Sequence, residues 1–135
     1  MRSIFLIILL TLTTAGIATA QTKDSTDKGY DKIFIIVDKP AEFPGGADGW
    51  RTYLQGNLKY PKKAWRKNTQ GVVRVQFEID RQGVVKEVKS MNDPGDGLAE
   101  EAVRVIQTSG KWVPAEHNGQ KVIYRHIQAI TFKLE

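Results

Sequence analysis

The 135-residue chain contains no cysteine, which excludes disulfide bonds, thiol catalysis and attachment of a lipid to a cysteine. It has only two histidines, His117 and His126, and neither lies at a metal-ligand spacing from a carboxylate. The adjacent Glu100 and Glu101 are explained by a place at a helix start, where the helix dipole favours acidic residues. No glycine-rich phosphate-binding spacing occurs either. The sequence therefore predicts a protein that is not an enzyme and that needs neither a cofactor nor a metal.

Long apolar runs are also scarce. The run from Ile4 to Leu12 is the longest, and it is shorter than the roughly 18 residues that a membrane-spanning helix needs. Ala18-Thr19-Ala20 follows it and fits the pattern of a signal-peptidase site. We predict a secretory signal peptide at residues 1–20, with an uncleaved membrane anchor as the alternative. Residues 21–36 are expected to form a flexible polar leader that ends in a short strand.

Strict alternation of apolar and polar residues marks the centre of the chain. In residues 71–79, Val73, Val75, Phe77 and Ile79 share one face of a strand. Residues 80–83 end in a glycine that suits a tight turn, so the next segment is expected to form the second strand of a hairpin. Its apolar residues Val85 and Val88 are three apart, which predicts a β-bulge near Lys86 and Glu87.

Helical periodicity and turn residues predict the other elements. We expect helices at residues 47–55, 61–67 and 98–108, with Ala64 and Trp65 facing inward, and strands at 32–38 and 122–134. Strands followed by helices in this order predict an α+β fold, a small antiparallel β-sheet with helices packed on one face. The expected shared core consists of the inward positions of the hairpin, the third helix and the last strand: Phe77, Ile79, Leu98, Ala102, Ile106, Trp112 and Phe132.

A basic cluster surrounds Tyr60 and Trp65; its members are Lys59, Lys62, Lys63, Arg66 and Lys67. Basic and aromatic residues alternate in nucleic-acid patches, but an exported protein rarely meets nucleic acid, so we expect no nucleic-acid partner. A docking patch for an acidic partner and a solvated basic face both remain open.

The last strand is about twice as long as a typical strand of five or six residues. A strand that lies at the edge of a sheet offers unpaired backbone groups, and an extended peptide can add to such an edge. Basic side chains, including Arg125, would limit unspecific pairing there. We expect one of Arg125 and Ile127, and not both, to direct its N–H group towards such a peptide. The alternative is that the extra length only closes the sheet.

Several short motifs now follow one another in the order and spacing of a known family. They are Phe43-Pro44-Gly45-Gly46, residues 57–61 (NLKYP), residues 71–88, Lys111-Trp112-Val113-Pro114, Asn118-Gly119 and residues 130–134 (ITFKL). Together they resemble the C-terminal domain of the TonB energy transducers, in the form that carries the FPGG segment. The resemblance assigns residues 37–135 to one TonB C-terminal-like domain.

This resemblance implies a periplasmic module that binds the TonB box, a short peptide of outer-membrane transporters, beside its last strand. The segment around the Tyr-Pro motif also contacts the transporter in that family. The partner-binding residues implied here are Asn57, Tyr60, Pro61, Lys63, Ile123, Arg125, Ile127 and Ala129. Ala129 stands where family members often have proline, which leaves one more backbone donor in the strand.

Two other functions remain open beside a non-catalytic peptide-binding module. The chain would be a short energy transducer if its apolar start stays in the cytoplasmic membrane, and only then do we expect membrane contact. It would otherwise be an adaptor or inhibitor domain of a periplasmic assembly unrelated to transport. A homodimer is compatible with each of these readings.

Overall fold

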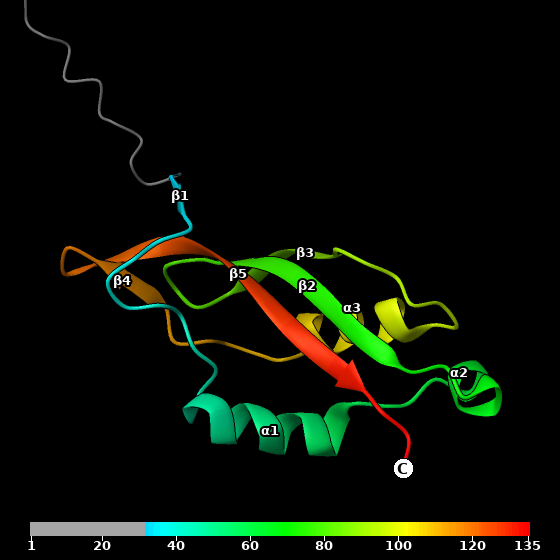
Figure 1. The fold of residues 1–135 in the computed structure, drawn as a ribbon. Helices are drawn as coiled ribbons and strands as arrows, with labels where there is room; N and C mark the ends of the chain where they lie inside the picture. Colours follow the sequence, from blue (N-terminus) through cyan, green and yellow to red (C-terminus); the bar gives the residue numbers. More distant parts are fainter. Residues whose placement is uncertain (1–31) are drawn as a thin grey trace, which may run out of the picture.

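The computed structural model describes residues 32–135 (Figure 1). The predicted signal peptide and most of the predicted leader therefore lie outside the described residues. In chain order the elements are β1 (Ile33–Phe34), α1 (Gly46–Asn57), α2 (Lys62–Lys67), β2 (Gly71–Ile79), β3 (Val85–Ser90), α3 (Leu98–Gln107), β4 (Ala115–His117) and β5 (Gln120–Phe132).

The predicted α+β fold is confirmed: three helices accompany a sheet whose strands follow the order β1-β5-β2-β3, and β4 pairs with the start of β5. The pairs β2–β3, β2–β5 and β4–β5 are antiparallel, as expected, whereas β1 runs parallel to β5. The predicted strand at residues 32–38 shrinks to the two residues of β1. The chain turns away after Phe34, because Lys39 and Glu42 pair with the segment that precedes and forms β4.

The central hairpin has the predicted bulge. Gln76 lies opposite Lys89, but Glu78 lies opposite Lys86, so two residues of β3 face one residue of β2. Glu87 takes up the extra residue with a positive φ of 52°. The spacing of Val85 and Val88 in the sequence therefore has this physical cause.

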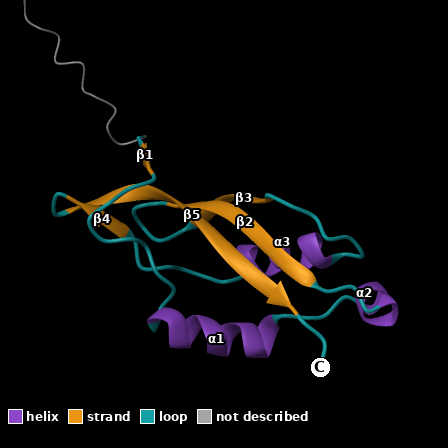
Figure 2. Ribbon diagram, viewed as in Figure 1, coloured by secondary structure: helices purple, strands orange, loops and turns teal. Residues whose placement is uncertain are grey.

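The helices α1 and α3 lie on the same side of the sheet (Figure 2). A hydrogen bond of 2.8 Å from the Tyr53 hydroxyl to the Val105 carbonyl joins them. The core lies between these helices and the sheet, and all seven residues predicted for it are buried: Phe77, Ile79, Leu98, Ala102, Ile106, Trp112 and Phe132. No helix of the described residues covers the opposite face of the sheet, where Val72 and Ile127 are exposed.

One prediction for α2 was wrong. Ala64 is fully buried, but the Trp65 side chain is 65% exposed instead of facing inward. Successive helical residues point about 100° apart, so a helix as short as α2 that buries Ala64 directs Trp65 towards solvent.

Candidate functional site

One edge of β5 is free along most of its length. On one side β5 pairs with β2 from Tyr124 to Phe132. On the other side β1 pairs only with Ile123 and Tyr124. Within residues 32–135, no further strand pairs with that side between Arg125 and Phe132. Figure 1 shows this part of β5, in red, at the border of the sheet above α1.

Hydrogen bonds on the side of β2 that faces away from β5 show, through the register of the two strands, which backbone groups of β5 face the free edge. The Met91 N–H donates to the Arg74 carbonyl at 2.7 Å, and the Arg74 N–H donates to the Asn92 side chain at 2.8 Å. Both backbone groups of Arg74 thus face β3. Neighbouring residues of a strand face opposite edges, so Val73 and Val75 face β5.

The register between β2 and β5 then shows which residues of β5 direct their backbone groups towards β2 and which direct them towards the free edge. Val75 lies opposite Gln128, so the backbone groups of Gln128 pair inside the sheet. The residues that alternate with it direct both N–H and C=O outward: Arg125, Ile127, Ala129 and Thr131. The expectation that only one of Arg125 and Ile127 faces outward was therefore wrong, because residues two apart in a strand face the same edge.

The predicted contact residues of β5 differ in their surroundings. Ile123 already pairs with Ile33 of β1, so the edge is occupied there. Arg125 reaches across to the Glu78 carboxylate at 3.1 Å on the uncovered face of the sheet. Ile127, which is 42% exposed, and Ala129 are both open to solvent. The available edge begins at Arg125.

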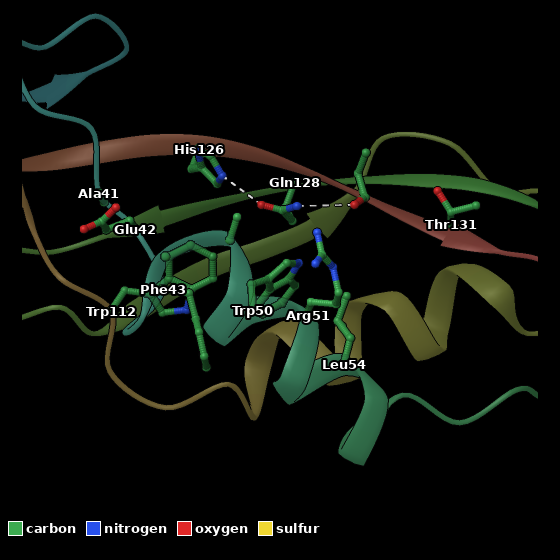
Figure 3. A pocket seen from close by; sticks show the side chains of 13 residues that line it. Ala41, Glu42, Phe43, Trp50, Arg51, Leu54, Trp112, His126, Gln128 and Thr131 are labelled. Atoms are coloured by element: carbon green, nitrogen blue, oxygen red, sulfur yellow. Dashed lines mark hydrogen bonds between the residues drawn. The ribbon is translucent and has the colours of Figure 1, made fainter.

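A groove of about 520 Å3 lies between the free edge and α1 (Figure 3). The β5 side contributes His126, Gln128, Ala129 and Thr131. The opposite side consists mainly of Phe43, Trp50, Leu54 and Trp112, with Arg51 and Glu42 as charged members. The groove thus combines apolar and aromatic walls with the unpaired backbone of a strand.

The Phe43-Pro44-Gly45-Gly46 segment positions the aromatic side of this groove. The Gly46 N–H closes a turn on the Phe43 carbonyl at 2.8 Å, with Gly45 in the left-handed region at a φ of 86°. A Cβ on Gly49 would lie 2.1 Å from the Pro44 carbonyl oxygen, so this turn can pack against α1 only because residue 49 is glycine. The Phe43 ring is thereby held 5.3 Å from the Trp50 ring.

His126 connects the groove to the core. Its ring lies 5.5 Å from Phe77 and 5.8 Å from Trp112, and its Nε2 atom is 3.1 Å from the Gln128 side-chain oxygen. Burial lowers the pKa of His126 below its ordinary value of 6.5, more than the contact with Gln128 raises it. The imidazole is therefore neutral at pH 7. The Gln128 amide also donates to the outward Ala129 carbonyl at 3.3 Å.

The other predicted contact residues extend from the last residue of α1 into the start of α2, at the end of β5 rather than along its edge. The Asn57 side chain is exposed and bonds the Tyr53 carbonyl at 2.9 Å. The Tyr60 ring packs 5.8 Å from Phe132, and its hydroxyl donates to the Thr69 carbonyl. The structure thus separates the predicted residues into the β5 edge and this Tyr60 surface, which we define as residues 57–63.

An ion pair of α3 holds the Tyr60 surface in place. Arg104 contacts Glu101 at 2.6 Å and donates to the Asn57 carbonyl at 2.8 Å, while the Lys59 N–H donates to Glu101 at 2.7 Å. Burial alone would raise the pKa of Glu101, but the hydrogen bonds from Arg104 and Lys59 outweigh it and lower that pKa. Lys63, the remaining predicted residue here, lies 3.5 Å from the Asp96 carboxylate.

Sequence reasoning missed the groove. It predicted a helix at residues 47–55, which contains Trp50 and Leu54, and it assigned Trp112 to the core. Each assignment holds by itself. The groove arises because α1 lies beside the free edge of β5, and no local pattern carries that information.

Residues 32–135 contain no cluster of three or more histidine or acidic side chains that could hold a metal ion. No helix in this part of the chain is both long and apolar enough to cross a bilayer.

Comparison with known protein families gives a match. Residues 56–134 match the family described as Gram-negative bacterial TonB protein C-terminal, and they make up more than half of the chain. The match covers α2, α3, the central hairpin and all of β5. No curated protein matches the chain.

Proposed function

Since the chain belongs to the Gram-negative bacterial TonB C-terminal family, which acts in TonB-dependent transport, we propose that it is a non-catalytic module that binds transporter peptides. Its ligand is a TonB-box-like peptide of an outer-membrane transporter. The peptide adds as a new strand to the free edge of β5, between Arg125 and Thr131. Membership of the family makes the chain a protein of the Gram-negative envelope, and we place this domain in the periplasm, after export and removal of residues 1–20.

The free edge of β5 is the observation that carries this proposal. Arg125, Ile127, Ala129 and Thr131 direct outward N–H and C=O groups that pair with no strand of the described residues. An added strand satisfies these groups in one step, and its affinity comes mainly from the main chain. Edge strands are otherwise a hazard, because they also pair with unrelated chains. A partner that covers this edge thus best explains why so long a part of β5 is left without a neighbouring strand.

The Tyr60 surface supports a second contact with the same transporter. It adjoins the end of β5, because Tyr60 packs on Phe132. Its exposed side chains are Asn57, Lys59, Lys62 and Lys63, and the exposed Trp65 of α2 follows it in the chain. A transporter that places its peptide on β5 would therefore also meet this basic surface, and acidic residues on the transporter would suit it.

Crosslinking in cells tests the proposal. A photoreactive residue at Ile127 is expected to capture an outer-membrane transporter, because this side chain is exposed beside the free edge. A probe at Met91, which is 51% exposed after β3 at the far side of the sheet, is the matched control and should capture none. Capture of transporters by both probes, or by neither, contradicts the proposal. Capture of a second copy of the chain by the Ile127 probe alone would instead indicate a dimer through the edge.

A further inference from the structure

The groove beside β5 lies where the side chains of an added peptide would point. Side chains of a strand alternate between the two faces of its sheet, and neighbouring strands are about 4.8 Å apart. On β5, His126 and Gln128 point towards the helices and line the groove. A peptide paired with the outward groups of β5 therefore directs every second side chain towards α1, into this groove.

The walls of the groove determine which side chain fits. Phe43, Trp50 and Trp112 form a continuous aromatic surface, with ring centroids of neighbours 5.3 to 5.6 Å apart. Leu54 extends it along α1, and the neutral His126 adds no charge. A volume of about 520 Å3 lies within the range of sites that enclose a ligand, roughly 300–1,000 Å3. The groove is large enough for a bulky side chain and offers it apolar contacts.

We propose that this aromatic groove selects peptides that carry a large apolar side chain, such as Leu or Trp, at a position facing α1. This inference rests on the proposed addition of a peptide strand to β5. The unpaired backbone groups bind any extended chain, and the groove adds the preference among sequences. Two features next to each other thus define one occupant: an extended peptide with a bulky apolar residue on its inward side.

The test uses acetylated nine-residue peptides in which Thr and Ser alternate around one central residue, which is Leu, Trp, Ala or Glu. Titration followed by NMR detects weak binding through the amide signals of β5. The Leu and Trp peptides are expected to bind at least tenfold more tightly than the Ala and Glu peptides, which corresponds to about 1.4 kcal/mol. The side chain of Ala47, which lines the groove and is exposed, gives a way to fill it: the Ala47→Trp variant should remove this preference.

Thr52→Trp is the matched control, because Thr52 is exposed on the same helix but does not line the groove. It should keep the ranking of the four peptides. Equal binding of all four to the wild type would overturn the inference while leaving strand addition intact. If no peptide shifts the NMR amide signals of β5, the inference is overturned as well. The crosslinking experiment at Ile127 then tests the proposed function separately. If Ala47→Trp does not fold, the ranking on the wild type decides alone.

Discussion

Proline substitution at two adjacent residues of β5 separates binding from folding. Ala129 directs its N–H outward, whereas Gln128 directs its N–H towards Val75 of β2. Proline removes the backbone N–H at either position, and in an extended strand the residue before proline already has a suitable conformation. The two variants therefore delete one backbone donor each, on opposite edges of the same strand.

The expected magnitudes follow from where each lost donor points. In Ala129→Pro the peptide carbonyl that would accept the hydrogen bond stays unpaired in the complex, at a cost of about 1–3 kcal/mol, or roughly 5- to 150-fold in Kd. Folding should change by less than about 1 kcal/mol, because Ala129 is exposed and proline is tolerated on an edge. Gln128→Pro leaves the carbonyl of the fully buried Val75 without its donor and places a ring between two paired strands. We expect it to lose at least about 1–3 kcal/mol of stability, out of the 5–15 kcal/mol of a typical domain.

The measurements are urea unfolding of both variants and titration of the folded ones with peptides from the crosslinked transporter. An Ala129→Pro variant that folds and binds like the wild type would show that this edge is not the docking site. Binding would then have to involve the Tyr60 surface. Alternatively, a Gln128→Pro variant that keeps its stability would show that the Gln128 N–H does not pair with Val75 and that the edges assigned to the residues of β5 are inverted.

Three further predictions concern the core, the groove and the N-terminus. Phe77→Ala should cost about 3–5 kcal/mol in urea unfolding, since the ring is fully buried and leaves a cavity; a loss below about 1 kcal/mol would contradict its packing role. The lowered pKa of His126 means that the unfolded chain binds the proton first, so stability should fall as the pH falls from about 6.5 to the pKa of the folded state. His126→Gln should remove this part of the pH dependence, and an unchanged slope would assign it to another group. Mass spectrometry of the periplasmic fraction should find a chain that starts at Gln21, whereas recovery only at full length in membranes would support the anchored alternative.

The central hairpin could be predicted from the sequence almost to the residue. Its strands carry a binary pattern of period two, and both the pattern and its interruption are local. The three-residue spacing of Val85 and Val88 predicted the bulge, which the structure places at Glu87. Asn118 and Gly119, one of the short motifs of the sequence, both have positive φ in the turn between β4 and β5. Local chemistry decides such features, so a single sequence is enough to find them.

The extent of β1 could not be predicted in the same way. Residues 32–38 have the composition of a buried strand, yet Ile35 and Ile36 are 67% and 86% exposed. The chain leaves the sheet after Phe34 because the Lys39 N–H donates to the Glu116 carbonyl at 3.0 Å, and Glu42 and Val113 exchange hydrogen bonds further on. These partners lie more than 70 positions away in the sequence. Competition between a local strand preference and distant pairing thus sets how much of β5 stays free.

A β5 edge that binds the proposed peptide must stay open to it and still avoid pairing with copies of itself, and several contacts of this strand suit both needs. β1 covers Ile123 and Tyr124, which shortens the exposed edge, and Arg125 at its start is held by Glu78. Further along, the Gln128 amide covers the outward Ala129 carbonyl through a hydrogen bond of 3.3 Å, which is longer than the usual 2.9–3.0 Å. A long bond between adjacent residues is weak, so an arriving peptide can replace it at little cost. The same Gln128 side chain contacts His126 in the groove. If the backbone of a peptide displaced the Gln128 amide, it would therefore also change the part of the groove where the inward side chain of that peptide binds. The proposed recognition of the backbone and the proposed selection of the side chain thus meet at Gln128.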